Sequence, residues 1–369
     1  MAWDKVWVGT TSTDFAVSTN WQKISLRNAG YVWTQKGATA EYYVRAAGPA
    51  DPAFGAKPGS VYINGTLAVE GTLGSLAVGE WCWGDPDTLG YNTITVRVTG
   101  DVDPDTLGRD YVQFQAVPNG ADTVTISGTA TNGIVSNVDQ SGLSAAAWRI
   151  EPGFRDKPLG SQGQRLRINP SSLVIDGGGS TPWYIDIGAA AIAVEIRSAP
   201  AGTNGQQGLY LTGSAITNIF ARAGTIGIAM QAGDTSTVGS IQTIGSQAIV
   251  TAGPGVTLTT ARALLGSIIL QAGAVTMDCQ GGAMETQLAA VASGNVYVKG
   301  GTFTDKSSGT HAAVTMDGGT LDTLQLTGAK TFSTFKLNAG TFKENVDLLT
   351  ITTRQEADYA GVLERRRAS

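Results

Sequence analysis

IAMQAG (residues 228–233) is the first of six similar phrases in the chain, and it is followed by AIVTAG (248–253), IILQAG (268–273), VYVKGG (296–301), VTMDGG (314–319) and FKLNAG (335–340). Each phrase alternates apolar residues with other residues and ends in glycine. Alternation with a period of two indicates a strand with one buried face, and the glycine allows a bend that a side chain would obstruct. The phrase therefore predicts one short strand per repeat.

The spacing of the phrases predicts how these strands stack. The closing glycines are 20, 20, 28, 18 and 21 residues apart: Gly233, Gly253, Gly273, Gly301, Gly319 and Gly340. One strand about every twenty residues, with no helical pattern between, predicts a parallel β-solenoid whose coils lie about 4.8 Å apart. We expect one apolar residue from each phrase to form a single buried column: Met230, Val250, Leu270, Val298, Met316 and Leu337.

Two segments are predicted to depart from this repeat. The longest interval contains MDCQGGAMETQLAAVASG (277–294), which we interpret as an insertion that protrudes from one coil. Near the end of the chain, Thr353 and Glu356 form a capping-box pattern that predicts a short helix covering the open end of the solenoid. Three arginines at the end of this helix are candidates for contact with an acidic partner surface: Arg365, Arg366 and Arg367.

Composition limits the class of protein. The chain has 369 residues, of which 49 are glycine and 15% are charged, and its formal net charge is −5. These values are typical of a turn-rich β protein that is neither disordered nor membrane-spanning. The acidic balance gives no reason to expect nucleic acid as a partner. Cys82 and Cys279 are too few and too far apart for a disulfide framework or a metal knuckle, and no motif indicates a cofactor.

Tryptophan and proline predict a boundary near residue 200. All eight tryptophans lie at or before Trp183, and Pro254 is the only proline after position 200. We therefore predict an all-β chain that ends in a short helix. Its four segments are an aromatic β module (1–56), β-strand modules (57–200), the parallel solenoid (201–352) and the C-terminal helix with its basic tail (353–369).

The first of these segments is rich in tryptophan, with Trp3, Trp7, Trp21 and Trp33. Two aromatic strands joined by a turn of Ser, Thr and Asp are the natural interpretation. The tryptophans can pack together as a cap, or they can form a docking surface, because tryptophan is enriched at protein interfaces. Both alternatives stay open at the level of sequence.

The sequence DPDTLG occurs twice, at 85–90 and 103–108. Asp, Pro and Gly at these positions supply the side-chain acceptor, the fixed φ and the free φ that a tight turn needs. Four carboxylates in the two copies are also oxygen ligands of the kind that calcium prefers: Asp85, Asp87, Asp103 and Asp105. Turn chemistry is favoured over a calcium site, because the alternating ligands of an EF-hand are absent.

The first copy belongs to a longer pattern, GEWCWGDPDTLGYNTITVR (79–97), which a second DPD follows. This pattern resembles a strand module, G-x-W-x-W-G-D-x-D-x-L-G-Y-x-T-x-x-V-R, of structural proteins in tailed bacteriophages and prophages. The resemblance covers 75–108 and is carried by nine residues: Trp81, Trp83, Gly84, Asp85, Asp87, Leu89, Gly90, Tyr91 and Arg97. The rest of the chain is similar in kind to the glycine-punctuated β repeats of phage fibres and head-decoration proteins. The resemblance implies a component of the virus particle.

Three functions are weighed on this basis. A non-enzymatic virion protein, either a capsid decoration or a head fibre, is favoured, and a tail fibre or receptor-binding protein is the alternative. The third is a polysaccharide depolymerase, which would need two carboxylates on neighbouring coils. The repeats offer Asp278, Glu285, Asp305, Asp317, Asp322 and one histidine, His311. The absence of tryptophan after Trp183 disfavours this enzyme, because sugar-cleaving solenoids usually expose aromatic platforms.

The expected partners follow from the favoured function. Flat, weakly charged faces favour association between copies, and closed symmetry favours a homotrimer. The major capsid protein, other virion proteins and host surface glycans are the further candidates. The N-terminal sequence MAWDKVWVGTT (1–11) shows no secretory signal, so we expect synthesis in the host cytoplasm and a final location in the virion.

Overall fold

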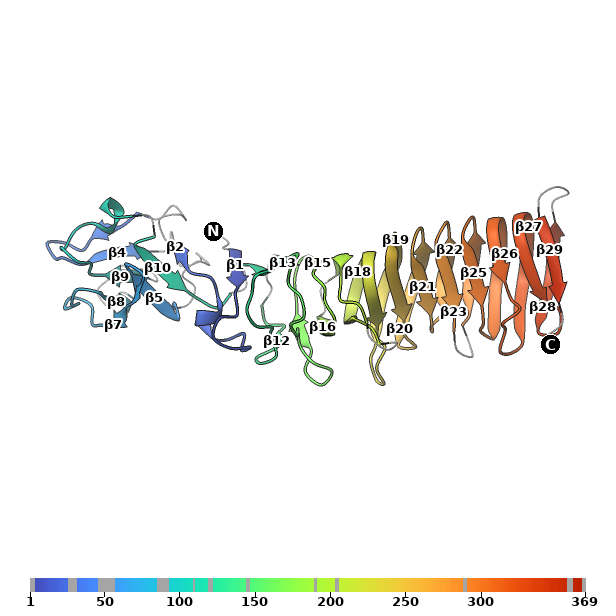
Figure 1. Ribbon diagram of the computed structural model, residues 1–369, viewed down its shortest axis with the longest axis horizontal. Coiled ribbons are helices and arrows are strands. Elements are labelled where there is room, and N and C mark those ends of the chain that lie inside the picture. The colour runs from blue at the N-terminus through green and yellow to red at the C-terminus, as the bar shows by residue number, and fades with distance from the viewer. Residues whose placement is uncertain are drawn as a thin grey trace. The chain divides into compact units, whose positions relative to one another are not determined.

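A computed structural model describes residues 4–25, 32–45, 57–84, 93–108, 110–118, 122–143, 147–188, 191–202, 206–287, 291–356 and 361–366. These residues form strands and turns, together with two short 3-10 helices, η1 (Ser18–Asn20) and η3 (Pro104–Thr106). Figure 1 shows the succession of strands along the chain. The chain divides into two compact units, Met1–Trp148 and Arg149–Ser369. The predicted all-β class with a parallel β-solenoid is confirmed, and the solenoid has about 11 turns.

The first unit contains two small sheets. Their strands are β2 (Ile24–Ser25), β3 (Thr34–Gln35), β4 (Tyr42–Arg45), β5 (Ser60–Ile63), β6 (Thr66–Leu67), β7 (Val69–Glu70), β8 (Glu80–Trp83), β9 (Thr93–Val96) and β10 (Val112–Gln115). One sheet has the order β2-β10-β5-β6 and the other β3-β4-β9-β8-β7. Because β4 pairs with β9 and β2 with β10, residues before position 56 share sheets with residues after it. The predicted boundary at 56/57 therefore falls inside one unit.

Parallel pairing begins in this first unit. Strand β1 (Asp4–Trp7) pairs in parallel with β11 (Thr123–Ile126), so the start of the chain lies beside a segment more than a hundred residues later. Strands β12 (Asp139–Gln140) and β13 (Ala147–Ile150) follow, and β13 contains the division between the units.

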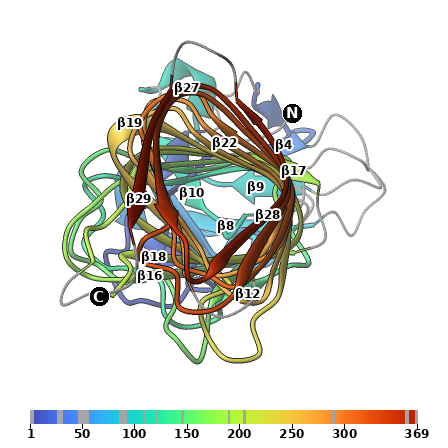
Figure 2. The same cartoon turned by 90° about the vertical axis from the view of Figure 1, so that its right-hand side faces the viewer.

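The second unit is a parallel coil. Its strands are β14 (Leu166–Ile168), β15 (Leu173–Asp176), β16 (Trp183–Ile187), β17 (Ile192–Ser198), β18 (Leu209–Ile228), β19 (Ser236–Ala252), β20 (Val256–Ala263), β21 (Ser267–Leu270), β22 (Ala274–Cys279), β23 (Ala283–Thr286), β24 (Ser293–Val298), β25 (Thr302–Asp305), β26 (Gly309–Asp322), β27 (Lys330–Asn345), β28 (Leu349–Glu356) and β29 (Gly361–Arg366). Long strands such as β18 and β27 bend around the coil, and Figure 2 shows successive coils end-on, with β27, β28 and β29 nearest the viewer.

Residues 149–200 already belong to this coil. Strand β16 pairs in parallel with β18, Trp183 lying beside Leu209, and β15 pairs in the same way with β17. The boundary predicted at 200/201 therefore falls inside the solenoid. The loss of tryptophan and proline near position 200 marks a change in composition, while the backbone pairing continues across it.

The glycine phrase occurs on two different sides of the coil. Leu270 pairs with Thr286 on β23, whereas Val298 pairs with Cys279 on β22 and Met316 on β26. The predicted single column is therefore wrong. The interval of 28 residues contains one coil of 16 residues, from Leu270 to Thr286, and then a crossing to the other side of the coil.

Strand alternation nevertheless identifies inward-facing residues well. Five of the six predicted column residues are buried: Val250, Leu270, Val298, Met316 and Leu337. Met230 lies beyond the end of β18 and is half-buried, so its assignment to the core column was wrong. Alternation predicts which side chains of a strand face inward. It does not predict which side of the coil that strand occupies.

The segment 277–294 does not protrude as an insertion over its described residues. It completes β22, forms β23 and begins β24. Met277 and Met284 are buried in register with the neighbouring coils, Met277 beside Val296 and Met284 beside Phe303. Residues 288–290 of the predicted insertion lie outside the described residues.

The helix predicted over 353–369 is wrong over the residues described. Strands β28 and β29 continue the coil, with Thr353 beside Thr334 and Val362 beside Thr341. Parallel pairing with β27 satisfies the backbone groups of both segments, and their β-branched residues favour strands. These effects outweigh one capping-box pattern.

Among the described residues, the side chain of Arg354 lies over the last apolar layer of the core. Arg354 follows Phe335 in register, and its guanidinium lies 5.7 Å and 5.9 Å from the ring centres of Phe335 and Phe342. Glu344 binds this guanidinium and also accepts a hydrogen bond from Arg365. A cation over aromatic faces, held by a carboxylate, shields the apolar layer from water.

Candidate functional site

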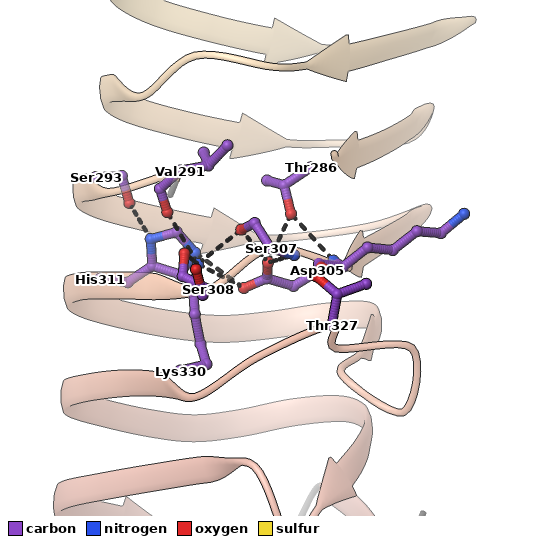
Figure 3. Close-up of polar contacts among 10 residues, drawn as sticks. Thr286, Val291, Ser293, Asp305, Ser307, Ser308, His311, Thr327 and Lys330 are labelled. Carbon is purple, nitrogen blue, oxygen red and sulfur yellow. Dashed lines mark hydrogen bonds and ion pairs between the residues drawn. The ribbon is translucent and has the colours of Figure 1, made fainter. Parts of the chain in front are cut away.

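A polar cluster interrupts the apolar interior of the second unit. On one side of the coil, the inward residue changes from Leu270 to Thr286 and then to Asp305. On another side, Ser293 and His311 follow Ala274 in register. Figure 3 shows that the polar side chains among them point toward one another inside the coil, where Lys330 joins them: Thr286, Ser293, Asp305 and His311.

Asp305 lies at the centre of this cluster. Its Oδ1 accepts hydrogen bonds from Thr286 Oγ1 at 2.6 Å, from Ser307 Oγ at 2.9 Å and from the Ser307 backbone N–H at 3.2 Å. Its Oδ2 lies 3.0 Å from His311 Nε2 and 3.2 Å from Lys330 Nζ. Both oxygens of the carboxyl group are thus surrounded by donors.

Lys330 supplies the positive charge of the cluster. Its ammonium donates to the backbone oxygen of Val291 and to Ser307 Oγ, each at 3.0 Å, and lies 3.4 Å from the backbone oxygen of Ser308. Asp305, His311 and Lys330 all have 0% exposure. A buried ion pair is tolerated only where further hydrogen bonds replace the lost water, and this cluster meets that condition.

The electrostatics follow from burial and from these partners. Burial alone would raise the pKa of Asp305, but the hydrogen bond from His311 and the charge of Lys330 hold it well below its usual range. Burial lowers the pKa of His311 and that of Lys330, and in both cases Asp305 opposes the shift. At neutral pH the imidazole is therefore neutral. It donates from Nε2 to Asp305 and accepts at Nδ1 from Ser293 Oγ, 2.6 Å away.

Ser293, His311 and Asp305 therefore form a chain of the residue types used in nucleophilic hydrolysis. A catalytic base has to come within hydrogen-bond reach of a substrate. His311 and Asp305 expose no surface, and Lys330 occupies the space beside the carboxylate. The arrangement is suited to holding coils together, because His311 and Asp305 are fully buried, while Ser293 is half-buried.

The other carboxylates weighed for polysaccharide cleavage lie elsewhere. Asp322 lies beside Thr304, so it is on the face of its strand opposite to that of Asp305, and the two do not form a pair across the coils. The remaining three are bound by neighbours. Asp278 contacts Arg262 and Lys299, Glu285 contacts Lys306, and Asp317 accepts a hydrogen bond from Asn338.

The candidate calcium ligands serve as turn acceptors where they are described. Asp103 accepts a hydrogen bond from the backbone N–H of Asp105, and Asp105 accepts one from the backbone N–H of Trp33. Asp85 and Asp87 lie outside the described residues. Within the described part of the chain, no cluster of three or more His, Cys, Asp or Glu side chains could hold a metal ion.

Three of the four tryptophans proposed as a docking surface are buried. Trp7 and Trp21 pack edge to face at 5.3 Å, and Phe15 and Trp148 stack beside them. Trp33 belongs to the core of the two small sheets. These rings therefore pack inside the first unit, and the docking role fails for Trp7, Trp21 and Trp33. Trp3 lies outside the described residues.

Two of the three C-terminal arginines, Arg365 and Arg366, lie on β29. Arg365 is bound to Glu344, and Arg366 lies 3.7 Å from Glu364. Their side chains are 59% and 68% exposed, so they remain accessible to an acidic partner. Arg367 lies outside the described residues.

Both cysteines are free and buried, and burial raises the pKa of each thiol to about 11. No helix in the part of the chain that the structure describes has the length and hydropathy of a membrane span.

No family model, curated protein or solved structure matches the chain. Function therefore has to be argued from the site and the fold.

The buried imidazole predicts a loss of stability in mild acid. His311 is the only histidine of the chain, and burial lowers its pKa below the ordinary value of 6.5. The unfolded chain takes up this proton first, so stability is fully present above pH 6.5 and falls as the pH drops below it. We expect the free energy of unfolding, measured in urea, to be lower at about pH 5 than at about pH 7.5.

The His311→Gln variant is the matched control, because glutamine keeps a donor and an acceptor but does not titrate. Its free energy of unfolding should change much less over the same range. An equal acid loss in the variant would contradict this role of His311.

Proposed function

We propose that the chain is a non-enzymatic structural component of a tailed-phage particle, either a capsid decoration or a head fibre. The observation that carries this proposal is the closed interior of the solenoid, which encloses even Asp305, His311 and Lys330. A stack of coils with a close-packed core resists deformation, which suits an element that must hold its shape on a particle.

The described residues that carry the resemblance to phage structural proteins have structural roles in the first unit. Trp81 and Trp83 stand on β8, where they pair with Val96 and Ile94 of β9, and Trp81 is buried in the core. Arg97 binds Asp101 through two hydrogen bonds and donates a third to the backbone oxygen of Leu76. The described residues of the motif thus build the sheet itself, which supports treating the motif as a folding module shared with such proteins.

A tail fibre or receptor-binding protein is the second candidate, and one observation favours it. Tyr184 and Tyr210 stack on the outer side of β16 and β18, with ring centres 4.7 Å apart and planes 4° apart. Arg165, Arg167 and Asp186 lie on the same strands or beside them. An aromatic ladder flanked by hydrogen-bonding groups is a surface that glycans recognise.

We further propose that the chain assembles as a homotrimer and contacts the major capsid protein or other virion proteins. Apolar and backbone contacts depend weakly on salt. The purified protein should therefore sediment as a trimer of the 38.1 kDa chain, both at high salt and under reducing conditions. A stable monomer at micromolar concentration would contradict the trimer in solution.

The non-enzymatic part of the proposal is tested with host surface polysaccharides. Purified protein should leave their chain length and reducing ends unchanged over long incubation, even where it binds them. If sugar ends are released by the wild-type protein, and not by a heat-unfolded sample, the depolymerase function replaces the structural one.

A further inference from the structure

We infer that Lys330 and Asp305 form an intramolecular isopeptide bond that joins neighbouring coils of the solenoid. The inference rests on the geometry of the buried cluster and goes beyond the proposed function. Without this bond, the two side chains would form a buried ion pair.

The reacting groups are in contact and sealed from water. Lys330 Nζ lies 3.2 Å from Asp305 Oδ2, and both side chains have 0% exposure. Backbone oxygens of Val291 and Ser308 and the hydroxyl of Ser307 aim the amine at the carboxyl group. Because the two groups are already held in contact, the reaction needs no bimolecular encounter. This removes much of the activation barrier to amide formation.

The two carboxyl oxygens have different surroundings, and each fits one role in the reaction. Oδ1 accepts from Thr286 Oγ1 and from the N–H and Oγ of Ser307, which is a set of donors that stabilises a developing oxyanion. Oδ2 faces His311 Nε2 at 3.0 Å, which can pass protons to a leaving oxygen.

The reaction balances without an oxidant or a second substrate. A proton passes from the Lys330 ammonium to Asp305 Oδ2, directly or through His311, and leaves a neutral amine beside a neutral acid. The amine lone pair attacks Cγ, the new N–C bond forms, and Oδ1 carries the negative charge. A second proton moves from nitrogen to Oδ2 through His311, the Cγ–Oδ2 bond breaks, and one water molecule leaves. The ammonium and the carboxylate become one amide and one water.

Burial favours this step over a permanent ion pair. Desolvation lowers the pKa of Lys330 and acts to raise that of Asp305, so it favours the neutral amine and the neutral acid, whereas the donors around Asp305 favour its ionised form. The neutral amide also removes two charges from the interior, where each charge is costly.

Peptide mapping of the unfolded full-length protein tests the bond. Trypsin should cut after Lys306 but not after Lys330, because an acylated lysine is no longer a substrate. The expected product is a branched peptide in which 300–306 is joined to 307–336. Its mass equals that of the uncut linear peptide 300–336, so the deciding signal is a fragment spectrum with two amino termini, Gly300 and Ser307.

The intact mass supplies an independent readout. Wild-type protein should be lighter than its sequence by one water molecule, whereas Lys330→Arg and Asp305→Ala should have their full sequence masses. Because His311 carries the protons, His311→Gln should lower the cross-linked fraction while it retains both reacting residues.

An internal control comes from a similar pair whose lysine is exposed and whose aspartate is buried. Lys299 Nζ lies 3.3 Å from Asp278 Oδ1, and its side chain is 45% exposed. Water keeps this ammonium charged, so trypsin should cut after Lys299 completely. The inference is overturned if trypsin also cuts completely after Lys330 and the wild-type mass equals the sequence mass, because the pair is then ionic only. This outcome is read from the wild-type protein, so it does not depend on whether a variant folds.

Discussion

Replacing Leu270 by aspartate should unfold the solenoid unit. The Leu270 side chain has 0% exposure and lies in register between Ala252 and Thr286. An unpaired carboxylate at this position would cost more than about 4 kcal/mol, which is a large part of the stability of an ordinary domain. Loss of the cooperative thermal transition, followed by circular dichroism, is the expected result.

The matched control is Val275→Asp on the neighbouring strand β22. Val275 is 58% exposed, so the same chemical change there should alter the free energy of unfolding by about 0.5 kcal/mol or less. A Leu270→Asp protein that melts like wild type would show that Leu270 does not face the core.

Replacing Lys330 by methionine is expected to have the second large effect. The substitution leaves Asp305 buried without its cation and also removes the inferred amide, and the unpaired buried charge alone costs about 3–5 kcal/mol. Urea denaturation at neutral pH measures this loss, and it should exceed that of Lys343→Met. Lys343 lies 3.8 Å from Asp322 in a partly exposed pair, for which about 1 kcal/mol or less is expected.

The double variant Asp305→Asn with Lys330→Met shows whether the two residues act together. Because neither charge remains, it should be more stable than the sum of the two single losses predicts. Strictly additive losses would mean that the two side chains do not stabilise each other.

Much of the fold could be predicted from the glycine phrases. Period-two alternation identified inward residues such as Leu270 and Val298, and the spacing identified a parallel coil. The register could not be predicted, because each coil contains more than one strand and the phrase appears on different sides. Only backbone pairing reveals that Leu270 precedes Thr286, and that Cys279 precedes Val298.

The sequence indicates the polar cluster less clearly than it indicates the solenoid. The aligned strands SIIL (267–270), AMET (283–286) and TFTD (302–305) show one inward position changing from leucine to threonine to aspartate. Once the register is known, this change marks a buried polar site. Lys330 could not be assigned to it, because Lys330 begins β27 and reaches Asp305 from another part of the coil.

The C-terminal segment shows where local sequence signals fail. A capping box at Thr353 predicts a helix in isolation, but the exposed edge of β27 offers partners for a whole strand. Arg354 was not predicted as a cap either. Its role depends on the rings of Phe335 and Phe342, which lie below it only in the folded coil.

The central claim is that this chain is built into a phage particle as a structural element. Negative-stain images of purified particles carrying a gold label at the C-terminus of the chain test it most directly. Labels spread over the head are the predicted result. Labels confined to the tail would favour the receptor-binding fibre, and particles that carry no label and lack the protein would contradict the account.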